Sequence, residues 1–263
     1  MKSWVKRIRA VAFDLDGTIY LGDHLVEGAL ELLHQLKQKN IAVVFFTNNS
    51  TKTRAQILGK LRMMGIPAEL RDIYTSTYAT AVFLKRKKFD RVYCLGSTGL
   101  IKEMEEKGIS VSEDPSRIKA IVIGLDLEFN YEKLAKCSKI LQRTKCKLIA
   151  CNLDNNYPIE NNMLLPGCGA IVSAVESASG KKVDYAVGKP NAFMLELLAK
   201  ELRLKSSEIL VVGDTYSSDI EMAKRHGCTS ILISGTAKKV YNDTIVVKDI
   251  RALKRLFVNY IRS

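Results

Sequence analysis

The sequence predicts an α/β protein whose core is a doubly wound parallel sheet, with a second, smaller α/β domain inserted into it. Three apolar runs, at residues 10–13, 41–46 and 209–212, end in polar residues that lead into turn or helical patterns. Short β-rich runs that alternate with helical patterns are typical of βα units around a parallel sheet. Because open α/β sheets bind ligands at the carboxyl ends of their strands, the polar residues after these runs are predicted to converge.

The first run, residues 10–13, leads into two aspartates, Asp14 and Asp16, followed by Gly17. Gly17 permits a tight turn that directs both carboxyl groups toward the end of the sheet. Two carboxylates so close together repel each other unless they share a proton or bind a cation. A hard dication with oxygen ligands fits, and Asp214 after the run at 209–212 supplies a third carboxylate. A single pair of this kind also occurs as helix caps and turn residues, but three converging strand ends favour a site.

The second run, residues 41–46, ends in Thr47 and Asn48. The stretch at 53–64 then has a helical pattern that stops at Gly65, a residue suited to a left-handed helix cap. The Thr47 hydroxyl and the backbone N–H of Asn48 are therefore predicted to donate hydrogen bonds to an anion at the end of the strand.

Phosphoryl transfer needs a nucleophile, a proton donor and positive charge, and the sequence offers each. Asp14 is the candidate nucleophile, because a carboxylate can form an acyl phosphate that hydrolyses. Asp16 is the candidate general acid and base. Lys189 precedes a helical pattern at 191–202, and we expect it in a solvent-reachable crevice beside the phosphoryl oxygens. The backbone N–H of Leu15 is a further candidate donor.

A large insertion separates the second strand from this lysine. Lys189 lies 142 positions after Thr47, whereas one βα return needs about 30 to 40 residues. We therefore predict a catalytic core at 1–78 and 187–263 and an inserted domain at 79–186. The insertion has its own strand-like and helical patterns, at 91–95, 120–123, 131–142, 147–151 and 170–177.

Composition excludes several classes of protein. The longest apolar run has six residues, far fewer than the roughly 18 that suggest a membrane span. The apolar stretch after the basic N-terminus stops at Asp14, too soon for a signal peptide, so a cytoplasmic location is expected. The six cysteines form no CxxC pair, which argues against a zinc site and a disulfide framework.

The net charge of +13 favours anionic partners, among which are phosphorylated metabolites, nucleic acid and acidic membranes. The basic runs at 85–88 and 248–262 are interpreted as solvated faces, which disfavours a nucleic-acid site. A small phosphorylated metabolite is thus the expected partner, with no membrane association. A homodimer is compatible with the sequence.

Four ordered segments resemble the motifs of the haloacid dehalogenase (HAD) superfamily: Asp14 to Thr18, Thr47 to Ser50, Gly188 to Asn191, and Gly213 to Asp219. The resemblance implies a Rossmann-like core. It also implies Mg²⁺ bound by the carboxylates of Asp14 and Asp214 and by the backbone carbonyl of Asp16, with Asp219 reaching the metal through water.

Two segments of the insertion, 123–126 and 165–170, resemble the large C2-type cap of the NagD-like, para-nitrophenylphosphatase branch. In that branch the cap selects the substrate. The candidate cap contacts are polar residues of one short stretch: Asn152, Asp154, Asn155 and Asn156. A solvated turn is the alternative interpretation of such an Asx-rich stretch.

Together these features predict a Mg²⁺-dependent phosphatase that hydrolyses phosphomonoesters of small metabolites through an aspartyl-phosphate. Sugar phosphates, nucleotides and phosphoglycolate-like compounds are the expected substrates. A phosphotransferase or phosphomutase would use the same Asp14 but shield the intermediate from water. A non-catalytic basic protein that binds phosphate or nucleic acid on the same fold is a second alternative. Its sequence would be expected to lack Asp14, Asp16 or Lys189.

Overall fold

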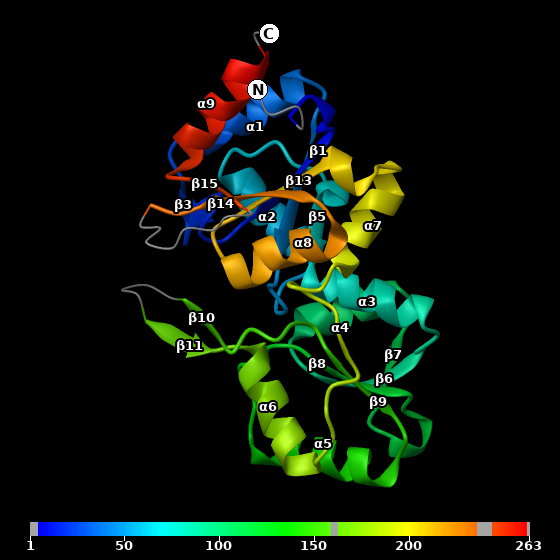
Figure 1. The fold of residues 1–263 in the computed structure, drawn as a ribbon. Helices are drawn as coiled ribbons and strands as arrows, with labels where there is room; N and C mark the ends of the chain where they lie inside the picture. The colour runs from blue at the N-terminus through cyan, green and yellow to red at the C-terminus, as the bar shows by residue number, and fades with distance from the viewer. Residues whose placement is uncertain (1–4, 159–162, 236–243, 262–263) are drawn as a thin grey trace. The chain divides into compact units, whose positions relative to one another are not determined.

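The computed structural model describes residues 5–158, 163–235 and 244–261, and the chain forms two compact units (Figure 1). The first unit comprises residues 1–47, 58–74 and 189–263, and the second comprises 48–57 and 75–188. The predicted insertion at 79–186 lies inside the second unit. Among the described residues, no helix combines the length and the apolar character that a membrane span requires.

A six-stranded sheet forms the centre of the first unit. In sheet order its strands are β15 (Ile245–Val247), β14 (Thr229–Ile233), β13 (Ile209–Gly213), β1 (Ala10–Asp14), β4 (Ala42–Thr47) and β5 (Ile73–Thr75). The central strand β1 pairs in parallel with β13 on one side and with β4 on the other. Every residue of β1 and β13 is buried, as the apolar runs predicted.

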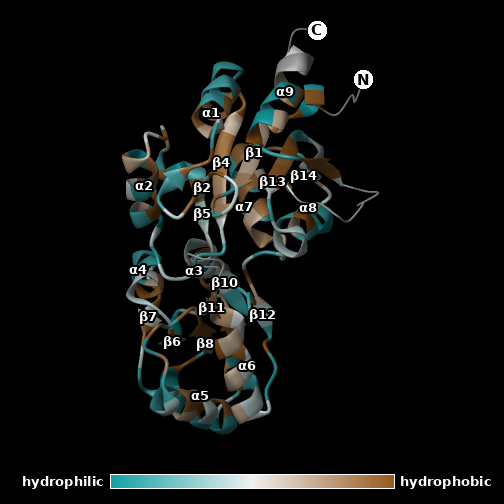
Figure 2. Cartoon of the chain, turned by 90° about the vertical axis from the view of Figure 1, so that its left-hand side faces the viewer, coloured by the Kyte–Doolittle hydropathy of each residue, from teal (hydrophilic) through white to brown (hydrophobic). Residues whose placement is uncertain are grey.

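Helices pack against this sheet and bury its central strands, which are hydrophobic along their length (Figure 2). The helices are α1 (Ala29–Gln38), α2 (Arg54–Met63, which begins in the second unit), α7 (Phe193–Leu202), α8 (Glu221–His226) and α9 (Ile250–Ile261). Helix α1 packs against α9, and α7 packs against α8. A short hairpin, β2 (Tyr20–Leu21) and β3 (His24–Leu25), and a π-helical turn η6 (Tyr216–Ile220) complete the part of the unit that bears on the site.

The second unit has its own parallel sheet and core. In sheet order the strands are β12 (Tyr185–Ala186), β9 (Lys147–Ala150), β8 (Ala120–Ile123), β6 (Arg91–Leu95) and β7 (Ser110–Val111). Its helices are α3 (Ser76–Arg86), α4 (Thr98–Glu106), α5 (Tyr131–Arg143) and α6 (Cys168–Ser179). Strands β6, β8 and β9 and helices α5 and α6 contribute the buried apolar cluster of this unit.

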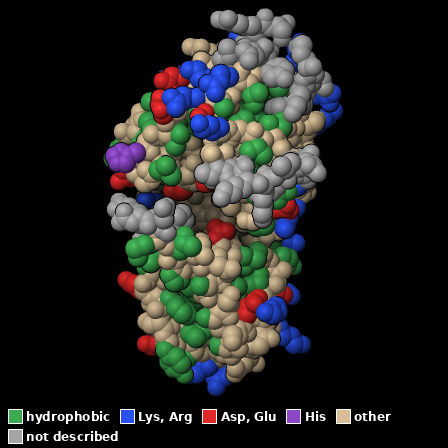
Figure 3. Space-filling view, turned by 60° about the vertical axis from the view of Figure 1, so that its left-hand side comes forward, with side chains coloured by type: hydrophobic (Ala, Val, Ile, Leu, Met, Phe, Trp, Pro, Cys, Tyr) green, Lys and Arg blue, Asp and Glu red, His purple; other side chains and the backbone are tan. Residues whose placement is uncertain are grey.

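An antiparallel hairpin of β10 (Asn156–Pro158) and β11 (Leu164–Pro166) joins the sheet of the second unit to α6. Leu164 is 59% exposed and Leu165 is 37% exposed. Figure 3 shows further hydrophobic side chains spread over one face of this unit.

Several predicted elements are confirmed. The strands predicted at 91–95 and 120–123 begin and end at those residues, and the helix predicted at 131–142 extends by one residue. The basic C-terminal stretch forms α9, which buries Ile250, Leu253 and Phe257 beneath its charged face. All six cysteines are free thiols, and four of them are buried.

Candidate functional site

The first unit brings three strand ends together as the sequence predicted. Strand β1 lies between β4 and β13, and Asp14 pairs in register with Phe46, the residue before Thr47. Asp214 directly follows β13, the neighbour of β1 on the other side. Asp14, Thr47 and Asp214 therefore lie at the carboxyl ends of three adjacent parallel strands, where ligands of such sheets bind.

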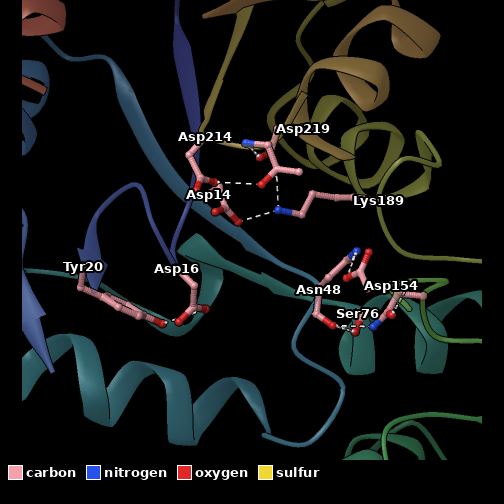
Figure 4. A network of polar contacts seen from close by, with 11 residues as sticks. Asp14, Asp16, Tyr20, Asn48, Ser76, Asp154, Lys189, Asp214 and Asp219 are labelled. Carbon is pink, nitrogen blue, oxygen red and sulfur yellow. Dashed lines mark hydrogen bonds and ion pairs between the residues drawn. The ribbon is translucent and has the colours of Figure 1, made fainter. Parts of the chain in front are cut away.

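Lys189 lies between two of the acidic residues (Figure 4). Its Nζ donates to Asp14 Oδ1 at 2.5 Å and to Asp219 Oδ1 at 2.6 Å. The expectation of a solvent-reachable lysine is wrong, because Lys189 is only 3% exposed. Burial lowers the pKa of Lys189, but the carboxylates of Asp14 and Asp219 raise it further, so that the net shift is upward and the lysine carries its charge.

The carboxylates of Asp14, Asp214 and Asp219 offer oxygens that all lie within 4.8 Å of one another. Burial raises the pKa of Asp14 well above its ordinary value, and Asp219 and Asp214 add to this effect, although Lys189 opposes it. Burial and then Asp219 also raise the pKa of Asp214. Three carboxylates face a single lysine charge, so the site favours a further cation. Carboxylate oxygens at this spacing fit a hard dication such as Mg²⁺.

Two glycines allow the carboxylates to approach the backbone this closely. Gly17 has φ of 90°, and a Cβ there would lie 2.2 Å from Asp214 Oδ2. A Cβ at Gly213 would lie 2.2 Å from Asp219 Oδ2. The sequence indicated the turn at Gly17 but gave no sign that either glycine makes room for a carboxylate.

The Asp16 side chain is exposed and points toward Tyr20 (Figure 4). The Tyr20 hydroxyl lies 3.5 Å from Asp16 Oδ2, and the backbone N–H of Gly17 donates to the Tyr20 carbonyl at 2.8 Å. Burial and then the Asp16 carboxylate raise the pKa of Tyr20, which keeps the phenol protonated as a donor. Tyr20 was not predicted as a site residue, and its place four residues after Asp16 is the only signal the sequence offers.

Leu15 and Thr47 are both buried at the strand ends. The Leu15 carbonyl accepts from the N–H of Ile19 at 2.9 Å and from that of Tyr20 at 3.2 Å, which fixes the turn after β1. The predicted phosphate contacts of Leu15 and Thr47 stay predictions.

Asn48 directly follows Thr47 and belongs to the second unit. Its Nδ2 donates to Asp154 Oδ2 at 2.8 Å (Figure 4). Its carbonyl accepts from Asn152 Nδ2 at 2.7 Å. Asn155 offers its carbonyl to the N–H of Gly167, and Asn156 begins β10. Two of the four predicted cap residues thus contact Asn48, and the roles of all four toward a substrate stay predictions.

Two protein-family models match the chain. The model described as haloacid dehalogenase-like hydrolase matches residues 11–110, and a HAD-hydrolase-like model matches 186–253. The matched segments contain Asp14, Asp16 and Thr47 in the first case and Lys189 and Asp214 in the second.

Proteins named as phosphatases are similar to this chain over most of its length. The acid sugar phosphatase of Staphylococcus haemolyticus is 36% identical, with 82% of this chain and 81% of that protein covered. Human glycerol-3-phosphate phosphatase is 31% identical, with 86% of this chain and 78% of that protein covered. The crystal structure of 4-nitrophenylphosphatase from Thermotoga maritima superimposes with a TM-score of 0.90 at 32% identity, covering 96% of this chain and 98% of that one.

The strand-end carboxylates, the buried lysine and these similarities agree with one another. The parallel sheet of the second unit also matches the resemblance of the insertion to a C2-type cap. This chain therefore belongs to the haloacid dehalogenase-like hydrolases, in the NagD-like, para-nitrophenylphosphatase branch with a C2-type cap, and it is a phosphatase of that family.

Proposed function

We propose that this phosphatase hydrolyses phosphomonoesters of small metabolites in a Mg²⁺-dependent reaction that passes through an aspartyl-phosphate on Asp14. The observation that carries the proposal is the buried lysine. Lys189 is held by Asp14 and Asp219 at 2.5 and 2.6 Å, beside a third carboxylate, that of Asp214. This arrangement fixes a nucleophile beside positive charge, which phosphoryl transfer requires.

The carboxylates of Asp14 and Asp214 and the backbone carbonyl of Asp16 would hold the Mg²⁺ ion, and Asp219 would reach it through water. When bound, the ion supplies positive charge that shields the phosphoryl oxygens and reduces their repulsion of the nucleophile. Asp219 serves two partners, because its Oδ1 accepts from Lys189 and its Oδ2 accepts from the N–H of Thr215 at 3.2 Å.

In the first step, one Asp14 oxygen attacks phosphorus while Lys189 holds Oδ1. The bond from phosphorus to the leaving oxygen breaks as the new Asp14–phosphorus bond forms. Asp16 gives its proton to the leaving oxygen, which departs as an alcohol. For this role the exposed Asp16 carboxyl has to turn from Tyr20 toward the substrate.

In the second step, Asp16 is a carboxylate and takes a proton from water. The water oxygen attacks phosphorus, the Asp14–phosphorus bond breaks, and inorganic phosphate and the Asp14 carboxylate are restored. The Thr47 hydroxyl and the N–H groups of Leu15 and Asn48 donate to the phosphoryl oxygens in both steps.

The substrate class follows from the relatives and from the cap. The similar proteins are phosphatases of glycerol 3-phosphate, of sugars and of 4-nitrophenyl phosphate. We propose small alcohol and sugar phosphates as the substrates, selected by the C2-type cap. These similar proteins are phosphatases, which favours water over a second alcohol as the acceptor.

A phosphate-release screen over sugar phosphates, glycerol 3-phosphate, nucleotides, phosphoglycolate and para-nitrophenyl phosphate tests the proposal. Turnover should require Mg²⁺, disappear in excess EDTA and return on adding Mg²⁺. Undiminished activity in EDTA would exclude the metal-dependent mechanism. Calcium should bind but support little turnover, because its looser coordination does not fix the nucleophile.

Two variants separate the roles of Asp14 and Asp16. Asp14→Asn cannot form the covalent intermediate and should be inactive. Asp16→Asn should still transfer phosphate from para-nitrophenyl phosphate, whose leaving group needs no proton. It should therefore give a burst of para-nitrophenol equal to the enzyme concentration, followed by slow turnover. A burst in Asp14→Asn, or trapped phosphate on another residue, would contradict the assignment.

A further inference from the structure

We propose that Asp154 is a positioning residue for phosphoryl binding, which it serves by fixing Asn48. The inference rests on the proposed function, in which the backbone N–H of Asn48 donates to a phosphoryl oxygen. Sequence patterns suggested that Asp154 contacts the substrate itself. The hydrogen bonds of the second unit instead direct its carboxylate to another protein side chain.

The Asn48 side chain is held at both ends of its amide group. Its Nδ2 donates to Asp154 Oδ2 at 2.8 Å. Its Oδ1 lies against the Cα of Gly188, where an added Cβ would approach it to 2.6 Å. A charge-assisted hydrogen bond on one side and close packing on the other leave the amide one orientation. Asn48 directly follows Thr47, and Gly188 directly precedes Lys189. The contact between Asn48 and Gly188 therefore joins the residue after Thr47 to the residue before the lysine.

The backbone of Asn48 is fixed as well. Its carbonyl accepts from Asn152 Nδ2 at 2.7 Å and from Ser76 Oγ at 2.9 Å. The contacts of the side chain and the carbonyl together restrain the backbone of Asn48, and with it the direction of its N–H. A donor fixed in advance toward the phosphoryl oxygens stabilises charge without reorganising during the reaction.

The backbone of Asp154 is itself held by hydrogen bonds. Its N–H donates to Asn152 Oδ1 at 3.1 Å, and its carbonyl accepts from the N–H of Gly169 at 2.8 Å. A Cβ at Gly167 would lie 2.2 Å from that carbonyl oxygen, and a Cβ at Gly169 would lie 2.5 Å from the Leu153 carbonyl oxygen. The first turn of α6 therefore packs directly on the backbone that carries Asp154, which explains the glycines of this segment.

A positioning role and a substrate contact predict different kinetics. The N–H of Asn48 meets the phosphoryl group, which all substrates and the product phosphate share. Loss of the Asp154 carboxylate should therefore lower kcat/KM for every phosphomonoester by a similar factor, whatever its leaving group. A direct contact with the rest of the substrate would instead change the ranking of substrates.

The test compares Asp154→Ala with Asp154→Asn, which keeps an oxygen acceptor for Asn48. We expect kcat/KM of Asp154→Ala to fall about tenfold to a hundredfold. The factor should be the same for para-nitrophenyl phosphate and for a sugar phosphate, and the inhibition constant of inorganic phosphate should rise. Asp154→Asn should recover most of the loss. Asp90→Ala is the matched control, because Asp90 forms an exposed pair with Lys119 at 2.8 Å in the same unit, and it should leave the kinetics unchanged.

A double variant, Asn48→Ala with Asp154→Ala, should be no worse than Asn48→Ala alone. Asn48→Ala also carries the test if Asp154→Ala does not fold, since it should show the same uniform loss. A fall in kcat/KM confined to one substrate, with an unchanged inhibition constant for inorganic phosphate, would overturn the inference. Reduced thermal stability with wild-type kinetics of the folded enzyme would overturn it too. A wild-type enzyme that hydrolyses no phosphomonoester would refute both the proposed function and this inference. An active wild-type enzyme whose kinetics are unchanged by Asp154→Ala would refute this inference alone.

Discussion

Lys189 donates hydrogen bonds to two of the three carboxylates at the strand ends. It neutralises part of a cluster of three carboxylates, and it donates at 2.5 Å to Asp14, the nucleophile of the proposed reaction. A lysine charge that is only 3% exposed is stable because two carboxylates accept its hydrogen bonds. Its removal therefore affects both the folded state and the reaction.

We expect Lys189→Ala to lower kcat by about a hundredfold or more, as loss of a charge stabiliser does. It should also lower the unfolding temperature without Mg²⁺, because the remaining carboxylates repel one another, and Mg²⁺ should restore much of the loss. Kinetics and thermal unfolding with and without Mg²⁺ measure both effects. Lys133→Ala, which breaks the pair with the buried Asp126 at 2.7 Å, is the control and should affect stability only. Near-normal kcat in folded Lys189→Ala would remove the lysine from the mechanism.

Some site residues could be predicted and others could not. Asp14, Thr47 and Asp214 were predictable because each ends an apolar run, and strand ends of a parallel sheet meet at one edge. The pairing of Asn48 with Asp154 was not, because 106 positions separate the two residues and no local pattern links them. The burial of Lys189 was missed for a similar reason, since its partners Asp14 and Asp219 lie 175 and 30 positions away in the chain.

The turn after β13 shows how an element shapes the site. Gly213 ends the strand, Asp214 follows it, and the π-helical turn η6 returns Asp219 to the end of the strand. The Asp219 carboxylate then occupies the space where any other residue at position 213 would carry its Cβ. The proposed metal binding would thus depend on the absence of a side chain at position 213.

Gly213→Ala should therefore impair metal binding more than folding. A Cβ 2.2 Å from Asp219 Oδ2 forces this carboxylate to shift, so the Mg²⁺ concentration for half-maximal activity should rise about tenfold or more. Gly59→Ala in α2 is the matched control, because a Cβ there meets no atom within 4 Å. That control should keep normal activity and gain helix stability of about 0.5–1 kcal/mol. Unchanged Mg²⁺ dependence in Gly213→Ala would contradict the role of this glycine.

Helix α4 holds the start of α2 through a buried acid. Glu103 is 2% exposed, and its Oε1 accepts from the backbone N–H of Arg54 at 2.6 Å. The Arg54 guanidinium stacks over the Tyr78 ring, with its Nε 3.9 Å from Glu103 Oε2. Burial raises the pKa of Glu103 above its ordinary value of 4.5, although the Arg54 N–H and charge and the charge of Lys107 lower it.

The stability of the protein should therefore depend on pH through Glu103. A raised pKa means that the folded state binds the proton more tightly than the unfolded state. The resulting contribution of Glu103 to the free energy of unfolding is fully present below about pH 4.5. It is lost as the pH rises through the higher pKa of the folded state. Glu103→Gln lacks this titration, so the free energy of unfolding of the wild type should fall relative to the variant over that range. Urea unfolding across a pH series measures the difference, and a constant difference would contradict the prediction.

Elements with long apolar runs were predictable, and short polar ones were not. The strands at 91–95 and 120–123 were located because β-rich runs end abruptly at polar or glycine residues. The hairpins β2–β3 and β10–β11 have two or three residues per strand and little alternation, so tertiary pairing rather than local pattern defines them.

The two units have separate sheets and separate cores, and the carboxylate cluster lies in the first. Bound Mg²⁺ should stabilise the folded state by about 2.7 kcal/mol at a hundredfold excess over its dissociation constant. Hydrogen exchange should show added protection in β1 and β13 and little in β8 and β9. Asp214→Asn should remove the effect. Equal protection of both sheets would indicate that the metal acts beyond the first unit.

The loop after Thr47 is bound by side chains that come much later in the chain. Ser76 and Asn152 donate to the carbonyl of Asn48, Ser97 Oγ donates to those of Ser50 and Thr51 at 3.1 and 3.0 Å, and these residues all belong to the second unit. A chimera that exchanges only the contiguous insertion would pair this loop with foreign partners. A cap transplanted from a related phosphatase should therefore function only when it is accompanied by its own counterpart of residues 48–57. The segments that would have to be exchanged together are thus separated in the sequence.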